Sequence, residues 1–333
     1  RVNVPGPHQA SILNTGSLED RARMEREAFR HECACAEAIG DDRLPMLHAW
    51  TGTDIFAAAF GSPVHRPADD MPFALPAVLE AAQADALREP PLDSGPLGEI
   101  FWLADRLVEF GGADIPLRIC DIQSPFDIAA LIWKKEAFFE ALVEYPESVH
   151  RLLEKVTRTL IRFIRAFLDR YPQACLVHFP ELWMPAEWGA CLSEDDAGSI
   201  SVRHFQEFCL PYLQQMAAEF GGLSIHCCAA AQHQWDGFLQ IPGMRYLNLF
   251  HPATSLEASI DKFSGRTVLV PMIGNRAEDG WMGHDSYLAF VQDCLRLVRP
   301  ETRFFFITEA PTVEEARQLT LEIKRLCGRS AQE

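Results

Sequence analysis

The chain has 333 residues, and 48% of them are hydrophobic, which excludes an intrinsically disordered chain and supports a large buried core. Its 47 acidic residues outnumber its 30 basic residues, giving a net charge of −17. Nucleic acids and anionic membrane surfaces both attract basic proteins, so neither is an expected partner. No apolar run approaches the roughly 20 residues that span a bilayer.

The predicted strands are short apolar runs that alternate with helical segments. In chain order they are Pro45–Trp50, Pro72–Val78, Asp114–Cys120, Ala174–Phe179, Leu223–His226, Met244–Phe250, Arg266–Met272 and Arg303–Ile307. This alternation predicts a parallel sheet covered by helices. The length fits two domains or one barrel, but eight β/α units favour a single α/β domain, a closed (β/α)8 TIM barrel, over residues 41–330. Residues 1–40 are expected to form an N-terminal helical extension.

Three helices have clear starting signals. Pro146 begins a segment with an apolar stripe at helical spacing, which predicts an amphipathic helix. Ser201 is expected to cap one helix that continues as far as Met216. Thr312 and Glu315 are spaced as a capping box at the start of the last helix.

Residues that carry chemistry gather at the predicted strand ends, where barrels place their active sites. They are His48, Trp50, Asp121, Gln123, His178, Glu181, His226, Cys228, His251, Asn275 and Glu309. Among them, His226 and Cys228 are two residues apart, so in extended backbone their side chains point to the same side. Zinc binds imidazole and thiolate together, although a buried histidine packed beside core cysteines fits the same pattern.

The acidic run Ser193–Asp196 has two interpretations. Ser193 and Asp196 are spaced to begin a helix, where carboxylates are favourable. Alternatively, Glu194 or Asp196 faces the barrel mouth as a hydrogen-bond partner of a ligand histidine or as a general acid.

The His-x-Cys strand end resembles the uroporphyrinogen decarboxylase superfamily, and more narrowly its zinc-dependent, corrinoid-linked methyltransferases. The similar stretches are Ile119–Ala130, Leu192–Tyr212, Gly221–Ala229, Leu269–Asn275 and Glu309–Ala316. The resemblance implies a (β/α)8 barrel. The decarboxylase proper has an Arg-rich loop after the first strand and a Gly-His-Gly element after the last. This chain has neither in Pro45–Asp54 or Ile307–Pro311, which favours methyl transfer over decarboxylation of a tetrapyrrole.

The resemblance also implies a ligand set. The methyltransferases usually supply a third zinc ligand, a cysteine, at the end of the last strand, where this chain has Glu309. A carboxylate is an acceptable zinc ligand. The expected set is therefore His226, Cys228 and Glu309, with His251 as a further candidate, and Ala229 replaces the family's glycine after the motif.

The sequence thus predicts a methyltransferase that moves a methyl group between a small ether, thioether or thiol and a corrinoid (cobalamin), with zinc as activator. The corrinoid is expected on a partner protein or as a co-substrate. Asp121 and Glu181 are the expected catalytic residues. The expected substrate-binding residues are His48, Trp50, Gln123 and Asn275. A metal-free decarboxylase and a non-catalytic corrinoid- or metal-binding protein remain alternatives. Ten cysteines without a secretion signal predict reduced thiols in the cytoplasm, and the resemblance allows a homodimer.

Overall fold

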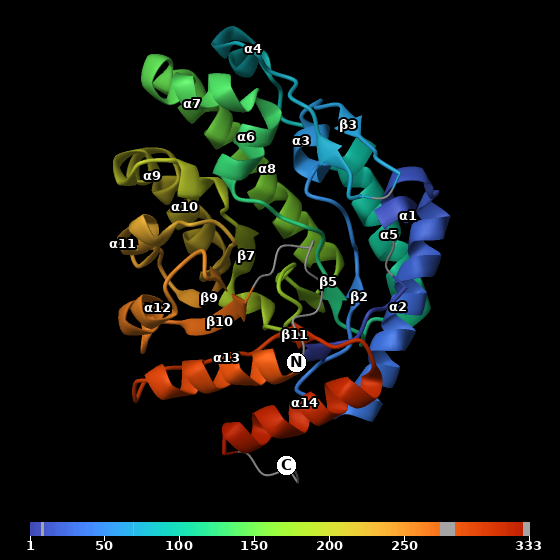
Figure 1. The fold of residues 1–333 in the computed structure, drawn as a ribbon. Coiled ribbons are helices and arrows are strands. Elements are labelled where there is room, and N and C mark those ends of the chain that lie inside the picture. The colour runs from blue at the N-terminus through green and yellow to red at the C-terminus, as the bar shows by residue number, and fades with distance from the viewer. Residues whose placement is uncertain (8–9, 69, 274–283, 329–333) are drawn as a thin grey trace.

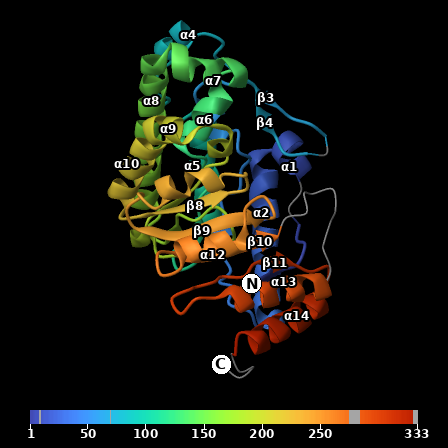
Figure 2. The same ribbon diagram turned by 60° about the vertical axis from the view of Figure 1, so that its left-hand side comes forward.

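The computed structural model describes residues 1–7, 10–68, 70–273 and 284–328 (Figures 1 and 2). Its strands are β1 (Val2–Asn3), β2 (Leu47–His48), β3 (Val64–His65), β4 (Phe73–Ala74), β5 (Leu117–Arg118), β6 (Ala174–Cys175), β7 (Ala190–Ser193), β8 (Leu223–Cys227), β9 (Met244–His251), β10 (Val268–Ile273) and β11 (Thr308–Glu309). Its α-helices are α1 (Ala10–Thr15), α2 (Leu18–Ile39), α3 (Ile55–Ala59), α4 (Ala81–Ala86), α5 (Gly95–Gly111), α6 (Pro125–Ile132), α7 (Lys135–Glu144), α8 (Pro146–Arg170), α9 (Val202–Phe208), α10 (Leu210–Phe220), α11 (Trp235–Phe238), α12 (Leu256–Phe263), α13 (His284–Leu297) and α14 (Val313–Leu326). Three 3-10 helices are η1 (Ala186–Trp188), η2 (Asp196–Ser199) and η3 (Gln232–Gln234).

Parallel pairing dominates the sheet. Strands β10, β9, β8 and β7 are neighbours in that order, and β2, β5 and β6 form a second parallel set. The backbone N–H of Cys191 in β7 donates to the carbonyl of Leu176, just after β6, at 2.9 Å, which links the two sets. At the other edge of the first set, Leu269 in β10 pairs in parallel with Phe304. Strand β11 pairs with β1. Figure 2 shows β8, β9 and β10 side by side, with α12 beside β10.

This α/β fold is consistent with the expected barrel. In the described residues, the strand pairs do not include β1 with β2. One apolar cluster nevertheless draws side chains from most of the parallel strands, and Met184 of the segment after β6 packs among them. Its members are Met46, Cys175, Val177, Met184, Cys191, Tyr246, Val270 and Ile307. A cluster of this kind is consistent with strands that curve around a common interior.

One of the eight predicted ranges contributes no strand to the main parallel sheet, although its Val78 forms an isolated parallel bridge with Trp133. Pro72–Val78 contains β4, which pairs antiparallel with β3 in a separate hairpin. Prolines at 72 and 76 remove N–H donors from this stretch, which disfavours a central strand. The missing parallel strand is β7, which lies at the start of the acidic run. The seven other predicted ranges each contain residues that pair in parallel.

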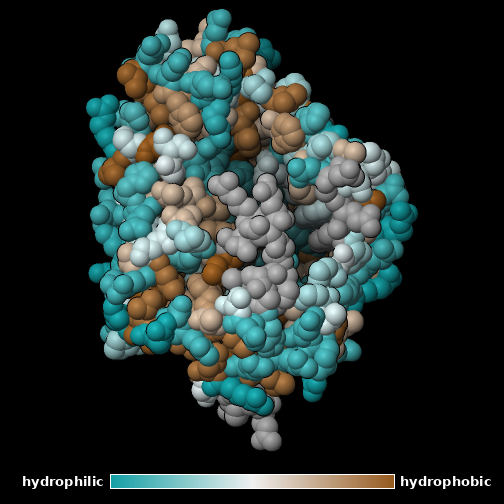
Figure 3. Space-filling model, in the orientation of Figure 1, coloured by the Kyte–Doolittle hydropathy of each residue, from teal (hydrophilic) through white to brown (hydrophobic). Residues whose placement is uncertain are grey.

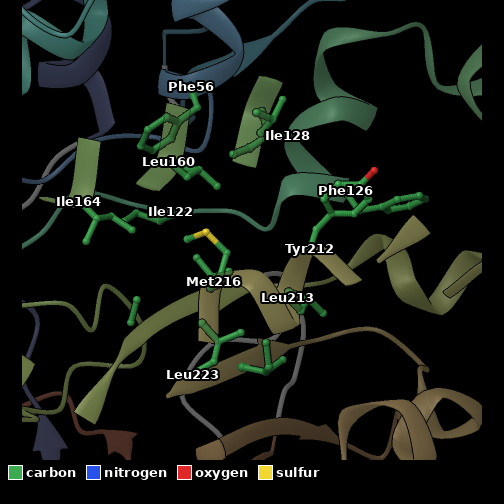
Figure 4. Packing of buried hydrophobic residues seen from close by; sticks show 14 of the residues in the cluster. Phe56, Ile122, Phe126, Ile128, Leu160, Ile164, Tyr212, Leu213, Met216 and Leu223 are labelled. Atoms are coloured by element: carbon green, nitrogen blue, oxygen red, sulfur yellow. The ribbon is translucent and has the colours of Figure 1, made fainter. Parts of the chain in front are cut away.

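The helices follow local signals and pack outside the strands. Helix α8 begins at Pro146 as predicted, and Figure 4 shows its Leu160 and Ile164 close to Phe56 of α3 and to Ile122. Helix α14 begins after Thr312, whose hydroxyl accepts the N–H of Glu315. The helix expected after Ser201 is two helices, α9 and α10, with a proline at the start of α10.

The first 40 residues contain α1 and α2, but also β1, which pairs with β11. Ser17 and Asp20 form a capping box at the start of α2, and Gly40 ends it with a φ of 67°, a conformation that favours glycine. Helix α2 packs against α5 and α14, and Figure 1 shows α14 beside α13.

The surface seen in one view is mainly hydrophilic. Figure 3 shows hydrophilic residues over most of the visible face, with hydrophobic residues in scattered groups. Within the described ranges, no helix combines the length and apolar character needed to cross a membrane.

Candidate metal and active site

Three potential metal ligands converge at the carboxyl ends of two adjacent strands. Asp195 follows β7, His226 lies in β8, and Cys228 comes directly after β8. One ligand atom from each residue lies within 4.8 Å of the other two. Because β7 and β8 pair in parallel with Ser193 opposite His226, the residues that follow Ser193 are brought to the same edge as Cys228. We call these three residues the ligand group.

The orientation of His226 is set by Asn248 in the neighbouring strand β9. The side-chain amide of Asn248 donates to the carbonyl of Val270 at 2.6 Å, so its oxygen is left as an acceptor. That oxygen lies 2.6 Å from Nδ1 of His226, which therefore carries the proton. Burial lowers the pKa of His226, so its ring is neutral at pH 7. The Nε2 lone pair, 4.0 Å from Asp195 Oδ1, is thus available to a cation.

Asp195 is positioned through backbone hydrogen bonds. Its Oδ1 accepts the backbone N–H of Cys228 at 2.7 Å, which ties the ends of β7 and β8 together. The backbone N–H groups of Asp195 and Asp196 donate to the carboxylate of Asp127 at 2.7 and 3.1 Å. Asp127 lies in the first turn of α6, where its own N–H donates to Ser124. The start of α6 therefore holds the turn that carries Asp195.

The donor chemistry of the ligand group fits zinc. Imidazole nitrogen, thiolate sulfur and carboxylate oxygen are its usual protein ligands, and three of them leave a position open for a substrate. Cys228 is exposed, so a small molecule has access to this side. Partial burial of the sulfur, followed by the Asp195 carboxylate, raises the pKa of Cys228 to about 12. A bound cation would reverse this preference, because it stabilises the thiolate.

An ion pair between the buried His178 and the half-buried Asp121 lies beside the ligand group. Nδ1 of His178 is 3.7 Å from Oδ2 of Asp121, and the amide of Gln123 donates to Oδ1 of Asp121 at 2.6 Å. Burial alone would lower the pKa of His178, but the Asp121 carboxylate raises it to about 10. Burial also opposes ionisation of Asp121, yet the charge of His178 holds its pKa below the ordinary value. Two expected site residues, Asp121 and Gln123, therefore form one polar unit near His226.

Aromatic rings surround the imidazole of His226. The rings of Phe179 and Phe250 meet it edge-on, with centroids 4.7 and 5.8 Å away. Such apolar walls limit access of water to Nε2 and lower the local dielectric.

Glu309, the expected third ligand, is not part of the ligand group in the described residues. It lines a different cavity together with Glu181 and His48. Strand β11, which carries Glu309, pairs with β1 rather than with a strand that holds a ligand. The structure thus places Asp195 at the third position of the ligand group, and three residues expected at the active site lie elsewhere.

His251 also lies away from the ligand group. Asn248 and Phe250 in β9 face His226, so the next residue points to the opposite face of the strand. There the ring of His251 lies 6.4 Å from that of Phe290 in α13, and its Nδ1 lies 2.7 Å from the carbonyl of Thr254.

Two further expected residues can be placed only in part. The backbone carbonyl of Trp50 accepts a hydrogen bond from Arg21 at 3.2 Å, and the next residue, Thr51, accepts the N–H of Asp121. Trp50 is therefore near Asp121 along the edge formed by β2 and β5. Asn275 lies outside the described residues.

Sequence reasoning missed Asp195 and Asn248. Glu194 and Asp196 were considered as residues facing the mouth, but Glu194 is fully buried, and burial raises its pKa to about 8. The alternation of β7 indicates Asp195 rather than Glu194 or Asp196, because Ser193 and Asp195 share a face. Identifying that alternation requires β7 itself, which was not predicted.

Comparisons with known proteins agree with the observed fold. The model of the uroporphyrinogen decarboxylase family (URO-D) matches residues 47–276, whereas no curated protein matches the chain. Among solved structures, a methyltransferase from Methanosarcina mazei is similar, with 14% identity, a TM-score of 0.69, and coverage of 98% of this chain and 94% of that one.

Two methionine synthases are also similar in fold. A B12-independent enzyme from Shewanella sp., in complex with selenomethionine, has 9% identity and a TM-score of 0.57, with coverage of 97% of this chain and 94% of that one. A putative vitamin-B12 independent enzyme from Listeria monocytogenes has 12% identity and a TM-score of 0.51, with 98% of each chain covered. These low identities show a shared fold alone. Since the family match spans more than half of the sequence, the chain belongs to the uroporphyrinogen decarboxylase family.

Proposed function

We propose that this protein is a zinc-dependent methyltransferase, built as a closed (β/α)8 barrel, that moves a methyl group between a small ether, thioether or thiol and a corrinoid. The observation that carries the proposal is the ligand group, Asp195, His226 and Cys228, at adjacent strand ends. Family membership and the similar fold of a methyltransferase support it. They leave the methyl donor open.

In this proposal, the residues of the ligand group and its neighbours have different roles. His226, Cys228 and Asp195 would hold the metal, with Asn248 fixing the imidazole so that Nε2 faces it. When bound, zinc would hold a substrate thiol as thiolate or polarise an ether or thioether leaving group.

The ion pair of Asp121 and His178 is placed to orient the polar end of the substrate. Burial and two internal contacts hold its geometry. His178, protonated at neutral pH, could donate a proton to a leaving oxygen or sulfur close to the metal. Phe179 and Phe250 would limit competing water.

The corrinoid would arrive on a partner protein. In that reaction the bond from the methyl carbon to oxygen or sulfur would break, and the reduced corrinoid would serve as the acceptor of the methyl group. The released alkoxide or thiolate takes a proton. The chain has a net charge of −17, so a partner with a basic docking face would be favoured electrostatically.

The direct test is methylation of cob(I)alamin by purified, zinc-loaded protein, supplied with methoxyarenes, methylthioethers or methanethiol. We expect a change in the cobalamin absorbance with at least one of these donors, and loss of that change after chelation of zinc. Cys228→Ser should reduce the rate at least about 100-fold. Cys327→Ser, which also changes an exposed cysteine, should not.

The proposal would be contradicted if zinc-loaded protein methylated cob(I)alamin with none of these donors. It would also fail if Cys228→Ser and Cys327→Ser behaved alike, because the ligand group would then have no role in the reaction.

A further inference from the structure

A second cavity lies beside strands β1, β2, β5 and β11, against α2. We call it the side cavity. Its volume is about 180 Å³, and its charged and polar lining includes Asn3, Glu25, His48, Arg118, Glu181 and Glu309. This volume is below the roughly 300–1,000 Å³ typical of pockets for drug-sized ligands, so only a small molecule would fit.

Arg118 is the unusual member of this lining. It lies in β5, only 6% of its surface is exposed, and its Nε is buried without a hydrogen-bond partner. In the part of the chain that the structure describes, this Nε is the only guanidinium nitrogen of Arg118 that is buried without a partner, and the main attractive charge near it is that of Glu181. Burial lowers its pKa, which reflects the cost of a desolvated charge. A buried guanidinium in this state favours an anion, and its planar fork matches a carboxylate.

The same cavity also presents negative charge. Glu181 accepts a hydrogen bond from the side-chain amide of Asn3 at 2.5 Å, so its carboxylate is held in place. Glu309 is close enough that burial, followed by the charge of Glu181, raises the pKa of Glu309. These two carboxyl groups line the same cavity as Arg118, and the charge of Glu181 partly offsets the lowering of the pKa of Arg118 by burial.

This mixture of charges restricts the kinds of molecule that the side cavity can bind. A simple anion bound to Arg118 would be repelled by Glu181 and Glu309. A simple organic cation held by the two glutamates would be repelled by Arg118. A metal ion is also disfavoured, because the side cavity contributes no close group of three ligands among the described residues. A molecule that carries both charges satisfies both ends of the cavity.

We propose that the side cavity is a binding site for a small zwitterion, an amino-acid-like molecule with a carboxylate and a protonated amine. The carboxylate binds the guanidinium of Arg118, and the amine lies beside Glu181 and Glu309. The site is separate from the ligand group, so its occupancy does not depend on the proposed methyl transfer.

The test uses glycine, L-alanine, β-alanine and γ-aminobutyrate, which separate the two charges by different lengths. Binding to the full chain is measured by calorimetry, and by the shift of the thermal unfolding midpoint. We expect at least one of the four to bind, and propionate and propylamine to bind at least about 10-fold more weakly.

Two variants test whether the ligand binds in the side cavity. Arg118→Met should weaken binding of the active amino acid at least about 10-fold, and Glu309→Gln should weaken it several-fold. Arg203→Met, which changes an exposed arginine in α9, is the matched control and should bind as the original chain does. Zinc content is measured in each variant and should not change. If Arg118→Met does not fold, Arg118→Lys keeps the charge, loses the fork and should still weaken binding.

Three results would overturn the proposal. These are no binding of any of the four amino acids, undiminished binding by both the Arg118 and Glu309 variants, and propionate binding as tightly as the best amino acid. The last result would show that Arg118 selects an anion and that the carboxylates have no part.

Discussion

The ligand group and the side cavity differ in how their charged residues are held. In the ligand group each side chain has a defined partner: His226 bonds Asn248, and Asp195 bonds the backbone of Cys228. In the side cavity, Arg118 has a buried nitrogen without a partner, and two carboxyl groups line the same cavity. The first arrangement is preorganised for a single cation. The second places a buried guanidinium nitrogen without a partner in the same cavity as two carboxyl groups.

This difference shows that two residues at the ends of parallel strands do not necessarily belong to the same site. His226 and Glu309 both lie at the ends of parallel strands, but on elements that are not adjacent in the sheet. In the ligand group, adjacent strands whose inward residues lie at the same level bring the ligands together, as the pairing of β7, β8 and β9 shows.

The largest expected effect separates the two regions directly. Asp195→Asn removes a charged ligand while keeping the side chain's shape, so zinc affinity should fall at least about 100-fold. Glu309→Gln makes the same chemical change in the side cavity and should alter zinc affinity less than about twofold. Both are measured by competition with a chromogenic chelator. If the Glu309 variant lost zinc and the Asp195 variant kept it, the assignment of the third ligand would be reversed.

A smaller effect is expected from the residue that orients His226. Asn248→Leu removes the acceptor for Nδ1–H at similar volume, so the imidazole tautomer is no longer specified. Zinc affinity should fall by roughly 10–100-fold, as is typical of partners that orient a ligand. The thermal unfolding midpoint, measured in parallel without zinc, separates this loss from unfolding. Unchanged affinity in a folded variant would show that His226 is oriented by other contacts.

The smallest expected effect concerns pH. The titratable groups around His178 are Asp121, Cys191 and His226. Because its folded pKa of about 10 exceeds the ordinary value of 6.5, His178 contributes stability fully below pH 6.5 and loses it as the pH rises towards 10. The free energy of unfolding should therefore fall by on the order of 2 kcal/mol between pH 7 and 10.

Asp121→Asn is the matched control for this pH dependence. Without the carboxylate, burial keeps His178 neutral, so its part of the decline should disappear. Chemical denaturation at several pH values measures the slope. Equal slopes in the original chain and the variant would show that the ion pair does not carry the dependence.

Local patterns predicted the fold better than the site. Pro146 and the Thr312–Glu315 pair set helix starts through short-range hydrogen bonds and sterics, and both predictions were confirmed. The parallel sheet followed from the β/α alternation. Strand β7 was missed because its four residues are followed by an acidic run that also suits a helix start. Pro72–Val78 is apolar enough for a strand, but its β4 pairs antiparallel with the nearby β3 in a separate hairpin.

Within the site, His226 and Cys228 could be predicted because their proximity depends only on two-residue spacing. The third member of the ligand group, Asp195, could not be predicted, because its place depends on which strand lies beside β8. Asp195 reaches the ligand group through the pairing of Ser193 with His226, a contact between strands that no local pattern encodes. His251 failed to reach the group for a related reason, because one residue along β9 reverses the face.

The most direct measurement is a crystal structure of zinc-loaded protein with anomalous diffraction recorded on both sides of the zinc absorption edge. The account predicts one strong peak about 2.0–2.3 Å from Nε2 of His226, Sγ of Cys228 and a carboxylate oxygen of Asp195. A peak beside Glu309, or no peak at the ends of β7 and β8 in zinc-saturated crystals, would contradict it.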